Sequence, residues 1–350
     1  MKSTMSAILL GITFLIFGSW SGIKTDTIAE GEQPQIALDN KGVIRIAFGQ
    51  KDRIFCATSN DQGTTFSKPV LVAQIPNMHL GMSRGPQLAS SANYSIITAM
   101  DKSGNIHCFQ LDHLSKEWKD RGTINDLKGS SPEGLMGIAA DKNDNFYAVW
   151  LDTRTGNKNQ IYFSSTSGNV THWSKNSLVY QSPDGHVCEC CRPSIAAEGS
   201  AVVIMFRNWL NGSRDLYLLS SPDKGRSFKM AQKLGMGTWK LNGCPMDGGG
   251  VIIDRSDAVQ TTWQREGIVY YCRPGQMETS IGKGRTCSIA GTTGNTIISM
   301  QSKDTLKVVK LPQKNEIVIG KGSFLKSMVL PDNKILCVWE QDHKIKYRKV

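Results

Sequence analysis

An internal repeat of short predicted strands runs through most of this sequence. Each repeat opens with a short apolar strand, passes through a polar turn into a strand that often ends in Trp or Phe, and reaches a third strand after a variable polar loop. The openings are PQIA (34–37), PQLA (86–89), MGIA (136–139), PSIA (193–196), a degenerate MDGG (246–249), CSIA (287–290) and a weak LKSM (325–328).

A repeated unit of three or four strands cannot bury both of its faces alone, and radial stacking of the units solves this. The repeat therefore predicts an all-β fold, a β-propeller with four-stranded antiparallel blades. Seven blades are favoured, and six blades with one irregular insertion are the alternative because the last two repeats are short. The final repeat ends after its third strand, so we expect residues 23–33 to supply its outer strand.

The N-terminus carries a separate signal. Lys2 precedes an apolar run over residues 7–18, and small residues follow at 19 and 21. This pattern is typical of a cleaved secretory signal over residues 1–21, with a single uncleaved anchor as the alternative. We expect residues 22–350 to form one propeller domain, secreted or periplasmic, with no stable membrane span after cleavage.

Composition excludes several classes of protein. With 39% hydrophobic and 20% charged residues, the chain is neither disordered, a coiled coil nor a fibre. Its formal net charge is +11, but the lysines are scattered and no nucleic-acid-binding module is visible. We expect no nucleic-acid partner and no cofactor, a monomer, and a carbohydrate ligand, with anionic glycans favoured.

Two octets share a stricter pattern, S-x-D-x-G-x-[TS]-F. They are SNDQGTTF (59–66) and SPDKGRSF (221–228). The Asp is expected to accept backbone N–H bonds across a turn, the Gly to adopt a positive φ, and the Phe to pack beneath. These octets resemble the Asp-box (BNR) repeat of the sialidase superfamily. The resemblance implies a propeller in which these turns lie on the rim, away from any active site.

Propeller geometry gathers the other loops on one face, which we call the mouth. It comprises the connections between successive blades and the loops between second and third strands. The connections carry Arg84, Glu133, His186, Arg192, Asp247 and Arg285. The second set carries Asp101, Asp152, Arg154, Asn208, Trp209, Arg214 and Arg265. Arg binds carboxylates through two parallel hydrogen bonds, so this mixture suits an anionic or hydroxyl-rich sugar. The alternative is that these side chains are solvated or paired with one another.

The resemblance also implies catalytic roles. Sialidases use a Tyr nucleophile, a Glu that activates it, an Asp acid/base and three Arg on the substrate carboxylate. Here Arg84, Arg192 and Arg285 match the Arg set, Asp101 or Asp152 the acid/base, and Glu133 with Tyr270 the nucleophile pair. The Phe/Tyr-Arg-Ile-Pro signature of the family is absent. Two hypotheses follow: an exported sialidase-like glycoside hydrolase, and a non-catalytic propeller that binds a glycan or a protein.

The nine cysteines form two groups. Cys56, Cys108, Cys272 and Cys337 lie in strand-like runs, where each can be a small buried hydrophobe. The others lie beside turns: Cys188, Cys190, Cys191, Cys244 and Cys287. Three interpretations stay open for the second group, namely disulfides that brace loops of neighbouring blades, a soft-metal site that includes His186, and a redox thiol.

Overall fold

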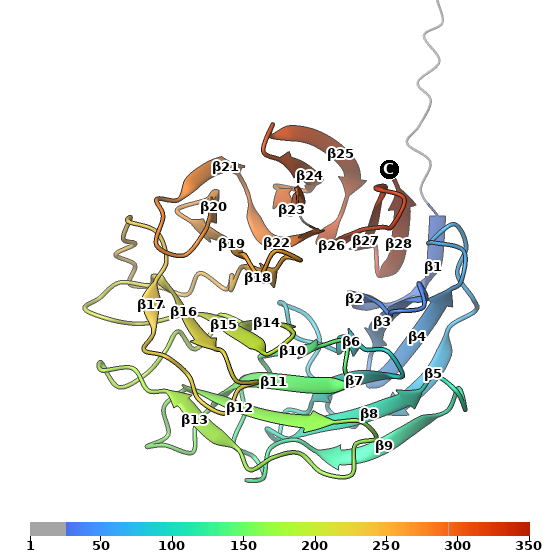
Figure 1. Cartoon of the computed structure of the whole chain (residues 1–350), viewed down its shortest axis with the longest axis horizontal. Helices are drawn as coiled ribbons and strands as arrows, with labels where there is room; N and C mark the ends of the chain where they lie inside the picture. Colours follow the sequence, from blue (N-terminus) through green and yellow to red (C-terminus); the bar gives the residue numbers. More distant parts are fainter. Residues whose placement is uncertain (1–25, 293) are drawn as a thin grey trace, which may run out of the picture.

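A computed structural model describes residues 26–292 and 294–350 and shows a ring of seven four-stranded antiparallel sheets (Figure 1). This confirms the predicted propeller and its count of seven blades. The predicted signal peptide, residues 1–21, lies outside the described residues. None of the described residues forms a helix long and apolar enough to cross a membrane.

The blades follow one another in chain order, each running from its innermost to its outermost strand. Blade 1 contains β2 (Glu32–Leu38), β3 (Ile44–Gln50), β4 (Arg53–Ser59) and β5 (Val70–Gln74). Blade 2 contains β6 (Gln87–Ser90), β7 (Tyr94–Met100), β8 (Ile106–Asp112) and β9 (Trp118–Thr123). Blade 3 contains β10 (Met136–Ala140), β11 (Asn145–Asp152), β12 (Gln160–Ser167) and β13 (Ser177–Tyr180). Blade 4 contains β14 (Ser194–Glu198), β15 (Ala201–Arg207), β16 (Leu216–Ser221) and β17 (Gln232–Lys233).

The last three blades complete the ring. Blade 5 contains β18 (Gly250–Ile253), β19 (Val259–Arg265), β20 (Ile268–Cys272) and β21 (Thr279–Lys283). Blade 6 contains β22 (Arg285–Thr292), β23 (Asn295–Ser302), β24 (Thr305–Leu311) and β25 (Asn315–Lys321). Blade 7 contains β26 (Ser323–Val329), β27 (Ile335–Gln341), β28 (Lys344–Lys349) and, as its outer strand, β1 (Asp26–Glu30). The predicted donor, residues 23–33, therefore supplies the outer strand through residues 26–30; residues 23–25 lie outside the described residues.

The hydrophobic core lies between adjacent blades rather than at the centre of the ring. One cluster packs Ile96 and Met100 of blade 2 against Phe146 and Trp150 of blade 3, and all four side chains are buried. Equivalent clusters join other neighbouring blades. Each sheet is covered on both faces by its two neighbours, so the core does not extend to the centre of the ring. The innermost strands can therefore present polar side chains to the central channel.

The two octets form the predicted turns. Asp61 accepts hydrogen bonds from the backbone N–H groups of Thr64 (3.1 Å) and Thr65 (3.0 Å), and these bonds with those of the Ser and Thr hydroxyls lower its pKa to about 2. Gly63 adopts a φ of 75°. The Phe of each octet packs edge-on against an aromatic ring of the preceding blade: Phe66 on Tyr347 and Phe228 on Phe163. The turns therefore fasten neighbouring blades together.

The mouth loops also follow the prediction, because one backbone hydrogen bond in every blade ties the outgoing connection to the loop between second and third strands. The donor and acceptor residues, from blade 1 to blade 7, are Ile75–Asp52, Ser131–Gly104, Val187–Asn159, Arg214–Trp239 (where the loop donates), Gly284–Gly267, Gly322–Asp304 and Gly31–His343. Both kinds of loop therefore lie on the same face of the ring.

Candidate functional site

The connections into blades 6 and 7 are single residues, Gly284 and Gly322. Both innermost strands open with a β-bulge, which places Thr286 and Phe324 at positive φ (48° and 56°) and shifts the register of β22 and β26. Bulges at a barrel rim redirect side chains and are common beside functional sites. A cavity of about 180 Å³ lies between these bulges and two longer loops; it is lined by Met82, Ser83, Pro245, Met246, Asp247, Arg285, Thr286, Gln301, Ser323 and Phe324.

A smaller cavity shares five of these residues and adds Arg192, Cys287 and Lys326. Arg192 also lines a third cavity, of about 160 Å³, between the innermost strands. The three cavities therefore share walls and lead from the mouth into the central channel.

Asp247 is the carboxylate of this region. It is buried, and its oxygens accept the backbone N–H groups of Thr286 (2.7 Å) and Gly249 (3.2 Å). Burial raises its pKa, while the Arg207 guanidinium and these hydrogen bonds act in the opposite direction. Asp247 therefore fixes the connection into blade 6 and lines the 180 Å³ cavity, and its predicted contact with a ligand stays a prediction.

Two cations, Arg192 and Lys326, face the same deep region. Arg192 donates to the side-chain carbonyl of Gln87 on β6. Burial lowers the pKa of Arg192, and burial together with the Arg192 charge lowers the pKa of Lys326 to about 7. Asp247 partly offsets both effects. Two buried positive charges thus lie near each other with one nearby carboxylate. Their mutual repulsion is unfavourable unless a bound anion offsets it.

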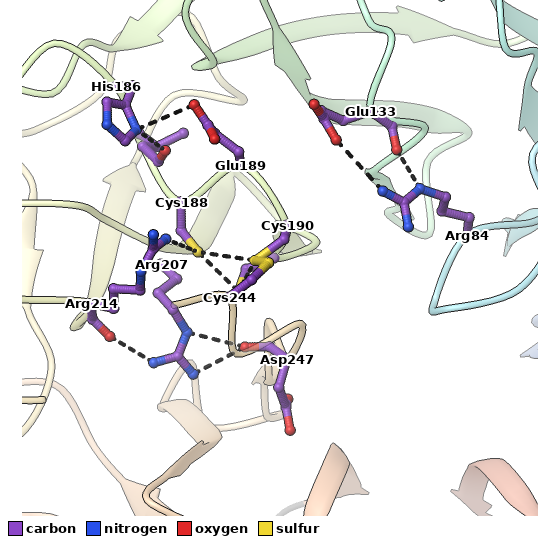
Figure 2. The surroundings of a disulfide bond; sticks show 12 residues. Arg84, Glu133, His186, Cys188, Glu189, Cys190, Arg207, Arg214, Cys244 and Asp247 are labelled. Atoms are coloured by element: carbon purple, nitrogen blue, oxygen red, sulfur yellow. Dashed lines mark hydrogen bonds and ion pairs between the residues drawn. A yellow bond between two sulfur atoms is a disulfide. The ribbon is translucent and has the colours of Figure 1, made fainter. Parts of the chain in front are cut away.

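Arg84 and Glu133, on the neighbouring connections into blades 2 and 3, pair with each other (Figure 2). Arg84 Nε donates to the Glu133 carbonyl oxygen (2.5 Å), and its Nη2 lies 3.5 Å from the Glu133 carboxylate. Burial raises the pKa of Glu133. Arg285, in contrast, lines the 180 Å³ cavity. Of the three predicted carboxylate-binding arginines, Arg192 and Arg285 therefore lie at the cavities, and Arg84 is engaged by a neighbouring loop.

The two predicted acid/base candidates lie in other networks. Asp152 is 0% exposed and accepts hydrogen bonds from Ser130 Oγ, Trp150 Nε1 and Arg154. Asp101 holds its own turn through Asn105 and lies 2.9 Å from His107 Nε2. Asp152 is thus inaccessible to a ligand in this structure, and Asp101 borders a separate cavity between the outer strands of blades 1 and 2.

The remaining predicted residues lie around blades 4 and 5. Asn208 is buried and donates to Tyr180, and Arg214 lies over the Trp209 ring at 4.6 Å. Arg265 pairs with Glu278 at 2.7 Å and lies over the Tyr270 ring. Tyr270 also stacks on Trp263 within the core of blades 4 and 5. These contacts are structural, and none of the five residues lines the 180 Å³ cavity.

A disulfide joins Cys190 to Cys244 and braces the connections on either side of blade 4 (Figure 2). This agrees with the first of the three interpretations of the cysteines. Cys188 and Cys191 remain thiols beside it, and Cys287 is a buried thiol. His186 stacks on Trp209, and its Nδ1 lies 2.9 Å from the Val187 carbonyl oxygen and 3.6 Å from the Glu189 carboxylate.

Lys326 is the residue that the sequence predictions missed. It occupies the second position of the weak opening LKSM (325–328). The same position in other openings holds Gln35, Gln87, Ser194 and Ser288, and all four line the channel. An alignment of the repeats by this position would have assigned Lys326 to the channel, but the weak motif obscured it.

A larger cavity, of about 590 Å³, lies among the innermost strands toward the opposite end of the channel. Lys142 bonds Glu198 there, and Asp254 caps its own turn through Ser256 and Ala258. Arg255 and Lys326 also line this cavity, so Lys326 borders both ends of the channel. The mouth adds Arg192 and Arg285 to Lys326 and is therefore the better candidate site for an anion.

Comparisons with known proteins support the fold. No family model matches the sequence, and no curated protein matches it. An ulvan lyase of polysaccharide lyase family PL25, bound to -[GlcA(1-4)Rha3S]-, has a TM-score of 0.59 at 10% identity, covering 93% of this chain and 96% of that one. An α-L-arabinanase of Penicillium chrysogenum complexed with arabinobiose has a TM-score of 0.54 at 12% identity, covering 93% of this chain and 97% of that one. The SapL1 lectin in complex with α-methyl fucoside has a TM-score of 0.52 at 11% identity, covering 85% of this chain and 97% of that one.

Proposed function

We propose that the mouth binds an anionic carbohydrate. The observation that carries this proposal is the pair of cations, Arg192 and Lys326, at the base of adjoining cavities with Asp247 as their nearby carboxylate. A carboxylate or sulfate placed between them would relieve their repulsion. Arg285 adds a third cation at the rim, and Phe324 offers an apolar face to a sugar ring.

The structural neighbours are consistent with this proposal. The ulvan lyase is described with a ligand that carries glucuronate and sulfated rhamnose, and the arabinanase and the lectin with neutral sugars. Propellers of this shape therefore serve both to process and to bind glycans. The net charge of +11 favours an anionic ligand for this chain.

Binding, rather than hydrolysis, is the proposed role. A glycosidase needs an acid and a nucleophile or base that reach the sugar. Of the predicted catalytic side chains Asp101, Glu133, Asp152 and Tyr270, none lines the 180 Å³ cavity. The proposal also includes export through residues 1–21, which would bring the protein to extracellular or periplasmic glycans.

The pH dependence of binding tests the proposal. A bound anion favours the charged form of Lys326, whose pKa of about 7 in the free protein lies well below the usual 10.5. Affinity for an anionic oligosaccharide should therefore be full below pH 7 and fall by up to about tenfold per pH unit above it. Calorimetric titration with uronate, sulfated and sialylated oligosaccharides at pH 6 and pH 8.5 measures this change.

The matched control is Lys326→Gln, which removes the charge and should abolish most of the pH dependence. Neutral oligosaccharides provide the second control. Equal affinity for neutral and anionic sugars, at both pH values, would contradict the proposal. Release of reducing ends or unsaturated products during the same incubations would show catalysis in addition to binding.

A further inference from the structure

The Cys190–Cys244 disulfide lies within a cluster of four sulfurs (Figure 2). Cys188 Sγ lies 3.1 Å from Cys191 Sγ and 3.7 Å from Cys190 Sγ, and Cys190 Sγ lies 4.0 Å from Cys191 Sγ. One short segment, C-x-C-C, supplies three of these sulfurs, and the loop before blade 5 supplies Cys244. The glycan-binding proposal uses none of them.

The spacing of the three sulfurs on this segment matches that of a metal–thiolate centre. Zn–S bonds of about 2.3 Å in a tetrahedron place the sulfurs about 3.8 Å apart. The three measured separations, 3.1, 3.7 and 4.0 Å, lie around this value. Cys188 and Cys191 are 0% and 1% exposed, whereas Cys190 is partly exposed and Cys244 is exposed, so the cluster is buried on one side and open to solvent on the other. Closely spaced sulfur ligands favour thiophilic cations over Mg²⁺ or Ca²⁺.

Two guanidinium groups provide the matching charge. Arg214 Nη1 lies 3.1 Å from Cys188 Sγ. Arg207 lies near these sulfurs in Figure 2, where its guanidinium donates to the backbone carbonyls of Arg214 and Asp247. A further hydrogen bond from Arg207 goes to the Gln264 carbonyl. Four thiolates around a divalent cation carry a net charge of about −2, which two guanidinium groups balance.

We propose that Cys188, Cys190, Cys191 and Cys244 bind one thiophilic d¹⁰ cation, Zn²⁺ or Cu⁺, when the Cys190–Cys244 disulfide is reduced. A dithiol reductant first transfers two electrons and two protons to the S–S bond and becomes a disulfide itself. With Zn²⁺, the four thiols then release four protons as four metal–sulfur bonds form; with Cu⁺, each metal–sulfur bond that forms releases one proton from its thiol. The bound cation and the disulfide are thus alternative cross-links between the loops on either side of blade 4.

Metal titration of the reduced, full-length protein tests this site. Zn²⁺ alone and Cu⁺ alone are added under anaerobic conditions, and native mass spectrometry measures the stoichiometry. We expect one equivalent of either cation in the wild type and in Cys56→Ser, which changes a buried thiol on β4. The double variant Cys188→Ser/Cys191→Ser should bind less than about 0.1 equivalent, because two of the four ligands are lost.

Cys244→Ser keeps the test valid if reduction unfolds the wild type. This variant has no Cys190–Cys244 bond to reduce and retains three thiols, so it should bind one Cu⁺ without a reductant. Failure of the folded, reduced wild type or of folded Cys244→Ser to bind either cation would overturn the proposal. Equal binding by the double variant would also overturn it. Neither result bears on the glycan site, whose residues are unchanged.

Discussion

Replacing Asp152 with Ala should lower the free energy of unfolding by about 3–5 kcal/mol. The carboxylate is fully buried and accepts hydrogen bonds from Ser130, Trp150 Nε1 and two nitrogens of the Arg154 side chain. Its removal leaves the Trp150 indole N–H without this acceptor and leaves Arg154 with Asp126 as its remaining carboxylate partner. Equilibrium denaturation in urea measures the loss.

Asp126→Ala is the matched control, because Asp126 pairs with the same Arg154 from the surface, at 2.6 Å and with a side chain 41% exposed. An exposed ion pair contributes at most about 1 kcal/mol, so this variant should be much less destabilised. If both variants lose the same free energy, burial of Asp152 is not the cause. A folded Asp152→Ala protein that still binds the anionic glycan would place this residue in the scaffold rather than in the site.

Removing β1 should destabilise the ring by roughly 2–6 kcal/mol, since four paired residues join it to β28 and each hydrogen bond contributes about 0.5–1.5 kcal/mol. Ile28 and Ala29 of this strand also pack on the cluster that joins blades 7 and 1. A chain that begins at Gly31 should therefore unfold at lower denaturant concentration than one that begins at Asp26. It should also associate more readily, because the edge of β28 is exposed.

A chain from Asp26 retains every strand that the structure describes and serves as the control for the loss of the preceding residues. Coincident unfolding curves for the two truncated chains would show that the terminal strand is not a closing element of the ring.

The fold could be predicted from the sequence because the repeat is visible in single strands. The openings and the strands that follow them recur in register, and the missing outer strand of the last repeat required a donor. The two octets predicted the conformation of the turns, because Asp61 accepts backbone N–H groups of its own octet and Gly63 adopts the positive φ of the same turn. Local chemistry of this kind does not depend on the partner blade.

The site could be predicted only in part, because its residues are selected by long-range pairing. The sequence placed Arg84, Arg192 and Arg285 on one face, but nothing local distinguishes Arg84, which pairs with Glu133, from Arg192 and Arg285, which line the cavities. The same holds for Asp152, whose burial arises from Trp150 and a neighbouring loop. The cysteine pairing likewise requires the approach of two connections that are far apart in the sequence.

A crystal structure with a bound anionic oligosaccharide tests the proposed glycan site. We expect a carboxylate or sulfate of the ligand within hydrogen-bond distance of Arg192 and Lys326, with a sugar ring against Phe324. The double variant Arg192→Gln/Lys326→Gln should then show no ligand under the same conditions. A ligand bound at the opposite end of the channel, beside Lys142 and Arg255, or on the outer strands of the blades, would contradict the claim.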